Sequence, residues 1–394
     1  MSLGERVPKL RFPGFEGEWI PTVLKSILHE RKTYAEKDGS YPHATLSKEG
    51  IYGKTDRYDR DFLVSTENKE YKITLKNDLC YNPANLKFGV ICLNTFGSAI
   101  FSPIYVTFEI DKSYSPQFVG AALTQKDFIG YALRFQQGTV YERMAVSPED
   151  FLSISRRFPA IAEQEKIAEF ISLLNSRIAA QRKLVELLKK HKRGLIKRLF
   201  RPNEHTKWKS VRLGDVGTFH KGAPLSKADI SEDGKPFILY GELYTTYGEI
   251  IKDVVRRTTA EIDIPYLSRC GDVIIPTSGE TAEEIATASC IMSDGVVLGG
   301  DLNIYRSEHI DGRFLAYAVR FIISRDISRI AQGVSVVHIS ATELKRISVS
   351  IPSKDEQIRI ISVLENYDNR ILHSQEILKK METTKDGLLQ QLFV

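Results

Sequence analysis

The sequence has few cysteines, and none is placed for a disulfide framework or a metal site. Cys80, Cys92, Cys270 and Cys290 are spread over 394 residues, and no two of them form a C-x-x-C pair. Structural zinc sites need closely spaced Cys and His ligands, and disulfide-rich proteins are mostly small and secreted. The sequence therefore predicts free thiols and no bound metal.

Long apolar runs are also missing. No stretch of 18 consecutive apolar residues occurs, so we expect no transmembrane helix. The first residues, MSLGERVPKLRF, lack the apolar segment of a signal peptide. With 42% hydrophobic and 27% charged residues, the composition is that of an ordinary globular protein. We expect a cytoplasmic protein with at least two domains.

Two sequence motifs resemble catalytic or nucleotide-binding sites but are incomplete. Gly53-Lys54-Thr55 matches the end of a P-loop, but the required first glycine would fall at Lys48. Residues 81–84, YNPA, resemble the N-P-P-aromatic motif of amino-methyltransferases, with Ala84 replacing the aromatic residue that stacks on a flipped base. Neither motif predicts an active site.

A third resemblance concerns nuclease motifs. Glu67-x-Lys69 and Glu343-x-Lys345 have the spacing of the final residues of such a motif. In a chain with 27% charged residues this spacing arises by chance. In the repeat described below, Leu152 replaces Lys345. We therefore expect no catalytic residue and no cofactor in this chain.

The sequence does contain an internal repeat. PAIAEQEKIAEFI begins at Pro159, and PSKDEQIRIISVL begins at Pro352. Aligned without a gap from these prolines, 11 of 42 positions are identical. A constant offset over that length indicates a duplication.

Each repeated segment is predicted to be one long helix. From Ile167 and from Ile360, apolar residues recur at alternating steps of four and three, which is the heptad pattern of a coiled coil. About 40 helical residues span about 60 Å. These apolar residues form a seam along each helix. Each seam could pack on the helix's own domain, but the strict period favours pairing of the two helices. Seam residues expected to be buried include Ile167, Leu174, Ile178, Leu188, Ile371, Leu378 and Leu388.

The segments before the helices are looser copies of one another. WIPTVLKSI (19–27) resembles WKSVRLGDV (208–216), and Asp78 aligns with Asp272. Runs such as VVLGGDLNIYR (296–306) predict strands, and other segments have helical spacing. We expect an α+β protein with a curved, mostly antiparallel sheet in each of two mixed α/β domains, followed in each case by a long coiled-coil helix. The predicted boundaries are 1–158, 159–200, 201–350 and 351–394.

Positive charge is concentrated in the first repeated helix. Residues 177–201 contain ten basic residues and one acidic residue. Such a stripe favours a polyanion or an acidic protein as partner, although a solvated helix face would look the same. The residues assigned to phosphate or subunit contact are Lys189, Lys190, Arg193 and Lys197.

Several loops are rich in polar, aromatic and basic residues. They lie at 52–60, 82–89, 219–227, 240–248 and 276–281. Loops of this composition suit contacts with phosphates and base edges, but ordinary surface loops share it. The residues predicted to bind DNA are Lys54, Arg57, Asn82, Asn85, Lys87, Lys221, Ser226, Lys227, Thr277 and Ser278.

Three features together resemble the specificity subunit of type I restriction–modification enzymes. They are VPKLRFPGFEGEW near the N-terminus, WKSVRLGDVGTFHKG in the second half, and the doubled P-x-x-x-E-Q-x-x-I helices. The resemblance implies two target-recognition domains, residues 1–158 and 201–350, each reading half of a split site in double-stranded DNA. Residues 159–200 and 351–394 would be antiparallel spacer helices.

The resemblance also implies partners that carry out the chemistry. Two methyltransferase subunits would bind the helices, and restriction subunits would join them. The assembled complex would be a site-specific deoxyribonuclease and adenine-specific DNA methyltransferase. Recognition loops vary within this family, so base-reading residues do not carry over from it. Two other functions remain open: a coiled-coil adaptor that does not read DNA, and a cryptic nuclease.

Overall fold

The structure, a computed structural model, describes residues 7–36, 40–54, 70–138, 144–202, 207–331, 333 and 337–393. The chain forms two compact units: residues 1–181 with 377–394, and residues 182–376. The division between the two units falls within the long helices, because each helix end packs on a domain.

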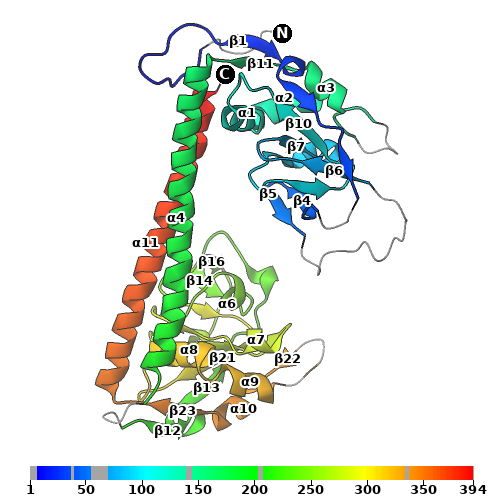
Figure 1. The fold of residues 1–394 in the computed structure, drawn as a ribbon. Coiled ribbons are helices and arrows are strands. Elements are labelled where there is room, and N and C mark those ends of the chain that lie inside the picture. The colour runs from blue at the N-terminus through cyan, green and yellow to red at the C-terminus, as the bar shows by residue number, and fades with distance from the viewer. Residues whose placement is uncertain are drawn as a thin grey trace. The chain divides into compact units, whose positions relative to one another are not determined.

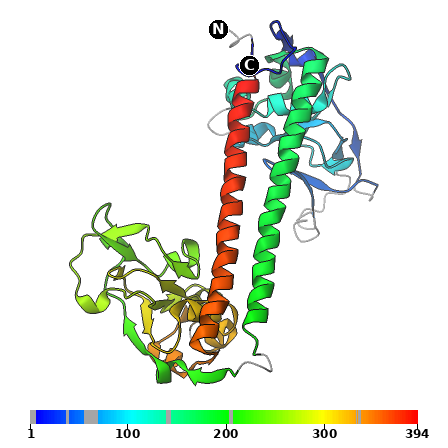
Figure 2. The same ribbon diagram turned by 90° about the vertical axis from the view of Figure 1, so that its left-hand side faces the viewer.

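Two long helices connect the units. Helices α4 (Ile161–Leu199) and α11 (Lys354–Leu392) have 39 residues each and lie side by side (Figures 1 and 2). In the first unit the start of α4 shares a core with Leu389 and Phe393. In the second unit the end of α4, at Ile196, shares a core with Ile360 and Leu364. The helices are therefore antiparallel, and the α+β fold class predicted from the sequence is confirmed.

The first unit is built from short, antiparallel strands. Its four-stranded sheet has the order β2 (Leu28–Glu30), β10 (Val106–Ile110), β7 (Leu79–Tyr81), β8 (Ile91–Leu93). Smaller sheets join β1 (Ile20–Val23) to β11 (Ser155–Phe158), β3 (Tyr34–Ala35) to β6 (Tyr71–Thr74) and β9 (Ala99–Phe101), and β4 (Ala44–Ser47) to β5 (Gly50–Gly53). The helical segments are η1 (Leu24–Ser26), η4 (Pro83–Phe88), α1 (Pro116–Leu123), α2 (Lys126–Ala132), η5 (Leu133–Phe135) and α3 (Pro148–Ser153).

The second unit repeats this plan with additions. Its five-stranded sheet has the order β13 (Thr218–Lys221), β21 (Leu302–Arg306), β17 (Val273–Pro276), β19 (Ser289–Ile291), β15 (Ile250–Ile251). Smaller sheets join β12 (Lys209–Arg212) to β23 (Ser348–Ile351), β16 (Arg256–Thr258) to β14 (Lys235–Ile238) and β20 (Val297–Leu298), and β18 (Ser278–Gly279) to β22 (Val337–His338). The helical segments are α5 (Leu213–Val216), η6 (Lys227–Asp229), α6 (Glu242–Thr245), η7 (Ile264–Tyr266), α7 (Ala282–Ile285), α8 (Gly312–Phe321), α9 (Ser324–Ile330) and α10 (Ala341–Arg346).

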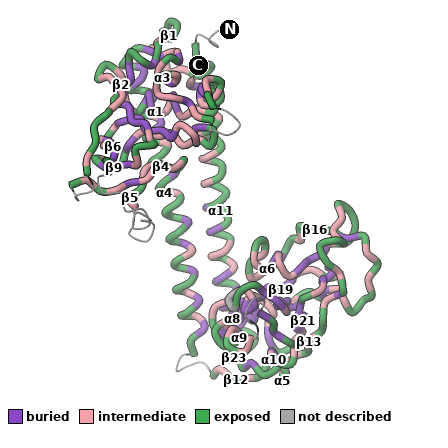
Figure 3. The backbone as a smooth tube through the Cα atoms, turned by 90° about the vertical axis from the view of Figure 1, so that its right-hand side faces the viewer, coloured by how far each residue is buried: buried purple, intermediate pink, exposed green. Residues whose placement is uncertain are grey.

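The single curved sheet expected in each domain was too simple. The described strands have two to five residues and are divided among several sheets. Turn residues interrupt the β-rich runs at short intervals, and this limits strand length. Most pairings are antiparallel as expected, but β14–β20 and β15–β19 are parallel. Figure 3 shows that buried residues concentrate in β19, β21 and α8 of the second unit.

The repeated P-x-x-x-E-Q motif joins each domain to its helix. The Gln164 side chain accepts a hydrogen bond from the Ser115 amide at 3.1 Å and donates to the carbonyl of the motif's proline at 2.9 Å. The Gln357 side chain does the same with the Asp311 amide at 2.8 Å and its own proline at 3.1 Å. Ser115 and Asp311 are the N-caps of α1 and α8. This shared contact explains why the glutamine occurs in both copies.

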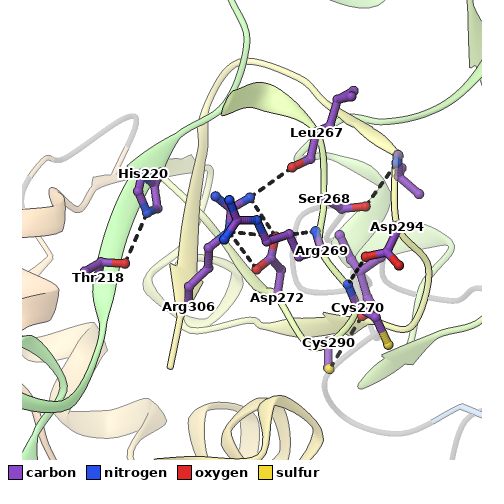
Figure 4. Close-up of polar contacts among 12 residues, drawn as sticks. Thr218, His220, Leu267, Ser268, Arg269, Cys270, Asp272, Cys290, Asp294 and Arg306 are labelled. Atoms are coloured by element: carbon purple, nitrogen blue, oxygen red, sulfur yellow. Dashed lines mark hydrogen bonds and ion pairs between the residues drawn. The ribbon is translucent and has the colours of Figure 1, made fainter. Parts of the chain in front are cut away.

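The aligned aspartates also occupy equivalent turns. Asp78 accepts the Leu75 amide at 2.7 Å, and Asp272 accepts the Arg269 amide at 2.8 Å. Each carboxylate also pairs with an arginine, Arg31 in the first unit and Arg306 in the second. Figure 4 shows Arg306 between Asp272 and the Leu267 carbonyl. The arginines come from different strand positions, so the turn is common to both copies and its cationic partner is not.

Candidate nucleic-acid interface

Three of the predicted polar loops meet at one end of the five-stranded sheet in the second unit. Strand β21 lies between β13 and β17. Lys221 at the end of β13 pairs with Asn303, and Pro276 at the end of β17 pairs with Leu302. Because both pairings are antiparallel, the ends of β13 and β17 lie beside the start of β21. Loops 219–227 and 276–281 therefore leave the sheet at the same end.

Backbone hydrogen bonds hold loop 219–227 against the turn that precedes β21. The Gly222 amide donates to the Leu302 carbonyl at 3.0 Å, and the Gly300 amide donates to the Leu225 carbonyl at 3.1 Å. A Cβ atom on Gly222 would lie 1.8 Å from the Gly299 carbonyl oxygen, so a side chain there cannot be accommodated. This close approach accounts for the glycine in FHKGAPLSK.

The other two loops are joined to the same turn. The Thr277 amide donates to the Asp301 carbonyl at 2.8 Å, and the Thr277 hydroxyl donates to the Asp301 carboxylate at 3.3 Å. From loop 240–248, the Tyr244 hydroxyl donates to the Ser278 carbonyl at 2.8 Å. Burial raises the pKa of Tyr244, and the carboxylates of Glu284 and Asp301 raise it further, so this hydroxyl remains a donor.

Asp301 lies at the centre of this cluster and was missed from the sequence. The run VVLGGDLNIYR was interpreted only as a strand. Asp301 is exposed and has a positive φ of 59°, which few residues other than glycine adopt. The pair of glycines directly before an aspartate and an apolar strand was the available signal.

The predicted residues of the second unit have different environments. Lys221, Ser226 and Lys227 are exposed, and Thr277 is half-buried. The Ser226 hydroxyl accepts the Ala228 amide at 3.2 Å and so caps η6. Ser278 is only 8% exposed and lies in β18. Its backbone is already bonded to β22 and to the Tyr244 hydroxyl, and its role as a DNA contact stays a prediction.

In the first unit, the predictions at η4 divide in the same way. Asn85 and Lys87 are exposed, and Lys87 lies 5.1 Å from the ring centroid of the exposed Phe88. Asn82 is 7% exposed, and its side chain accepts the Ala84 and Asn85 amides at 3.1 and 3.3 Å. Asn82 is therefore a helix cap, and its role as a DNA contact stays a prediction.

A further predicted residue, Lys54, lies beside the hairpin β4–β5. Lys54 follows β5 and is half-buried. Its amide donates to the His43 carbonyl at 2.8 Å. Arg57 lies outside the described residues, as do Thr55, Glu67 and Lys69 of the incomplete motifs.

The nuclease-like Glu343 has a structural role. Its carboxylate accepts the Ser340 amide at 2.7 Å, and the Ser340 hydroxyl accepts the Glu343 amide at 3.3 Å. This is a capping box at α10. In the first copy, Ser147 caps α3 and its hydroxyl contacts Asp150 at 2.7 Å. The acidic residue is therefore explained by helix capping in both copies.

The helix seam lies along the contact between α4 and α11. None of the ten heptad positions in either helix is exposed. Four of the seam residues predicted from the sequence are buried: Ile167, Ile178, Leu188 and Ile371. The other three are half-buried: Leu174, Leu378 and Leu388.

The basic stripe is only partly available to a partner. Lys190, Arg193 and Lys197 are exposed, and Lys189 pairs with Glu186 at 3.1 Å. Lys192 is 8% exposed and its ammonium lies 2.5 Å from Asp368 and 3.2 Å from Glu249. Lys192 therefore belongs to the interior of the second unit, and the accessible stripe is narrower than the sequence suggests.

A cavity of about 820 Å³ opens near the opposite end of β21. Its lining includes His220, Arg269, Asp272 and Arg306 (Figure 4). Burial lowers the pKa of His220, and the nearby Arg306 adds to this effect. Arg306 is engaged by Asp272, so much of the lining charge is neutralised internally. Among the described residues, no three His, Cys, Asp or Glu side chains are grouped to hold a metal ion.

Comparisons with known proteins agree with this architecture. Residues 205–383 match the family model "Type I restriction modification DNA specificity domain". The type I restriction enzyme MjaVIII specificity subunit of Methanocaldococcus jannaschii is 23% identical over 389 residues, covering 91% of this chain and 86% of that protein. The putative MjaX specificity subunit of the same organism is 23% identical over 292 residues, covering 67% of this chain and 66% of that protein.

Solved structures show the same fold. The type I restriction–modification S subunit from M. genitalium superposes with a TM-score of 0.59 at 17% identity, covering 98% of this chain and 99% of that one. A chain from a structure described as showing complex assembly and conformational transition of the type I system also has a TM-score of 0.59, at 17% identity, with 95% and 97% covered.

The chain is thus a two-domain protein, duplicated around a pair of long helices, and residues 205–383 match a DNA-specificity domain. Over most of its length it is similar to type I restriction–modification specificity subunits. Within the described part of the chain, no helix is long and apolar enough to cross a membrane.

Proposed function

We propose that this chain reads a bipartite site in double-stranded DNA, with one half-site for each recognition domain. The observation that supports this most directly is the meeting of three polar loops at one sheet end in the second unit. Exposed Lys221 and Lys227 suit phosphate contacts, and hydroxyl and carboxylate groups suit base edges. The duplication of the domain–helix unit supports one reader for each half of the site.

We also propose that the two long helices bind the partner subunits of the complex. Two methyltransferase subunits would bind, one for each copy of the repeat, and restriction subunits would join them. Exposed apolar residues on α4, including Leu184 and Leu187, support a protein partner on that helix. The chain itself would be non-catalytic and without a cofactor, and the complex would work in the cytoplasm.

Co-expression with candidate methyltransferase subunits tests the function. The purified complex is incubated with a random DNA library and a methyl donor, and the modified bases are mapped. We expect two short half-sites separated by a gap of constant length and unspecified sequence. Modification that does not depend on this chain, or that follows one continuous site, would contradict the proposal.

Two controls separate the other functions. The chain alone is incubated with DNA and divalent metal ions, and cleavage would indicate a nuclease. A footprint on the mapped site distinguishes a DNA reader from an adaptor, because an adaptor protects neither half-site.

A further inference from the structure

Asp301 presents an exposed carboxylate where the three loops of the second domain meet. It directly precedes β21, the strand between β13 and β17. The two residues before it, Gly299 and Gly300, have no side chains, and Asp301 itself is exposed. Its φ of 59° is left-handed, a conformation that aspartate and asparagine tolerate better than most residues.

The carboxylate is held in place but not saturated. Thr277 donates its amide to the Asp301 carbonyl at 2.8 Å and its hydroxyl to the Asp301 Oδ1 at 3.3 Å. An ionised carboxylate has about four acceptor positions. Among the described residues, no other hydrogen bond or ion pair of the Asp301 side chain is recorded. Acceptor positions therefore remain for a ligand that donates hydrogen bonds.

A carboxylate weakens non-specific attraction to DNA phosphates. The exposed Lys221, which pairs with Asn303 two residues after Asp301, suits a phosphate contact, and the Asp301 carboxylate suits a contact with a base better than a contact with the backbone. In the major groove, the exocyclic amino groups of cytosine and adenine are the available donors, and aspartate characteristically accepts from cytosine N4.

We propose that Asp301 is a specificity-determining residue of the second recognition domain. Its carboxylate, oriented by Thr277, accepts a hydrogen bond from the amino group of a cytosine in the second half-site. This inference rests on the proposed function and identifies one of its base contacts.

The test compares Asp301→Asn with Glu308→Gln in the assembled methyltransferase complex. Asparagine has nearly the same shape and adopts positive φ, so we expect the turn to be kept. Glu308 is an exposed carboxylate just beyond the other end of β21, which makes it a matched control. Binding and modification are mapped on a random DNA library, and a thermal melt verifies folding of each variant.

For the wild-type complex we expect a required C·G pair at one position of the half-site read by residues 201–350. Asp301→Asn should weaken that preference by about 5- to 150-fold, the range that corresponds to one good base contact. Preferences at all other positions should remain, and Glu308→Gln should read the site as the wild type does.

Two results would overturn the inference. One is unchanged specificity in Asp301→Asn, and the other is a uniform change in affinity across all sequences, which would indicate a purely electrostatic effect. If Asp301→Asn fails to fold, Asp301→Gly replaces it, because glycine accepts the same φ. A wild-type complex with no sequence preference would instead refute the proposed function.

Discussion

Gln357 shows how one buried side chain can join a domain to its helix. Its amide group bridges the Asp311 amide and the Pro352 carbonyl, and the side chain is 1% exposed. Removing it leaves both backbone groups without these partners. Each unsatisfied buried group costs about 1–3 kcal/mol.

We therefore predict that Gln357→Ala lowers the free energy of unfolding by at least about 1–3 kcal/mol. Urea denaturation followed by circular dichroism measures the change. Gln390→Ala, at an exposed position of the same helix, is the control and should have little effect. Equal stability of the two variants would argue against the bridge.

The cysteines differ sharply in expected reactivity. Burial raises the pKa of Cys92 to about 12, and burial also raises the pKa values of Cys80 and Cys290. The thiolate is the reactive form, and it is scarce for these three residues at neutral pH. Cys270 is exposed.

We predict that iodoacetamide at neutral pH modifies Cys270 well before the other three cysteines. Peptide mass spectrometry measures the extent at each site, and the urea-unfolded chain, in which all four should react, is the control. Native Cys92 reacting as fast as Cys270 would show that the first unit opens readily.

At the scale of elements, two neighbouring leucines of α4 differ strongly in burial. Leu188 is 8% exposed and lies in the heptad seam, whereas Leu187 is 45% exposed. Both residues have the same helix propensity, so the difference in their environments can be measured directly.

We predict that Leu188→Ala costs about 2–5 kcal/mol because it leaves a cavity in the seam. Leu187→Ala, the matched control, should cost less than about 1 kcal/mol. Chemical denaturation of both variants measures the difference. Similar stability losses in the two variants would contradict an intramolecular seam at Leu188.

The exposed basic residues of α4 allow a second test at this scale. If Lys190, Arg193 and Lys197 contact phosphates, replacing each with glutamine should flatten the salt dependence of DNA binding by about one unit per lost contact. Lys183, an exposed lysine earlier on α4, provides a comparison within the same helix. An unchanged slope together with lost methyltransferase binding would assign these residues to subunit assembly.

At the scale of the whole molecule, both long helices pass from one unit into the other. Their length should therefore affect the unread gap, whereas the loops should determine the bases read. Inserting seven residues into each helix preserves the heptad register and adds about 10 Å of helix.

We predict that this double insertion lengthens the unread gap by about three base pairs, given a rise of about 3.4 Å per pair. Modification mapping should show unchanged half-sites. The complementary variant replaces residues 12–158 with the first domain of another family member, and it should change one half-site and keep the gap. If the insertion altered the bases read but preserved the gap, this division of roles would be wrong.

The sequence alone determined the duplication and the long helices. A heptad pattern is periodic and local, so burial can be predicted from spacing, and none of the twenty seam positions is exposed. The same pattern could not show what Lys192 does. That residue fills a polar seam position, and only the tertiary structure places Glu249 and Asp368 beside its ammonium group.

The candidate interface was only partly predictable, because the partners of a polar side chain depend on the tertiary structure. Loop composition indicated Lys221 and Thr277, but it also indicated Asn82 and Ser278, which are buried. Whether a polar loop residue caps a helix or faces solvent depends on hydrogen bonds within its turn. Asp301 was not predicted, because its importance comes from strand register. Residues 221, 277 and 301 are far apart in sequence, and antiparallel pairing brings them to one sheet end.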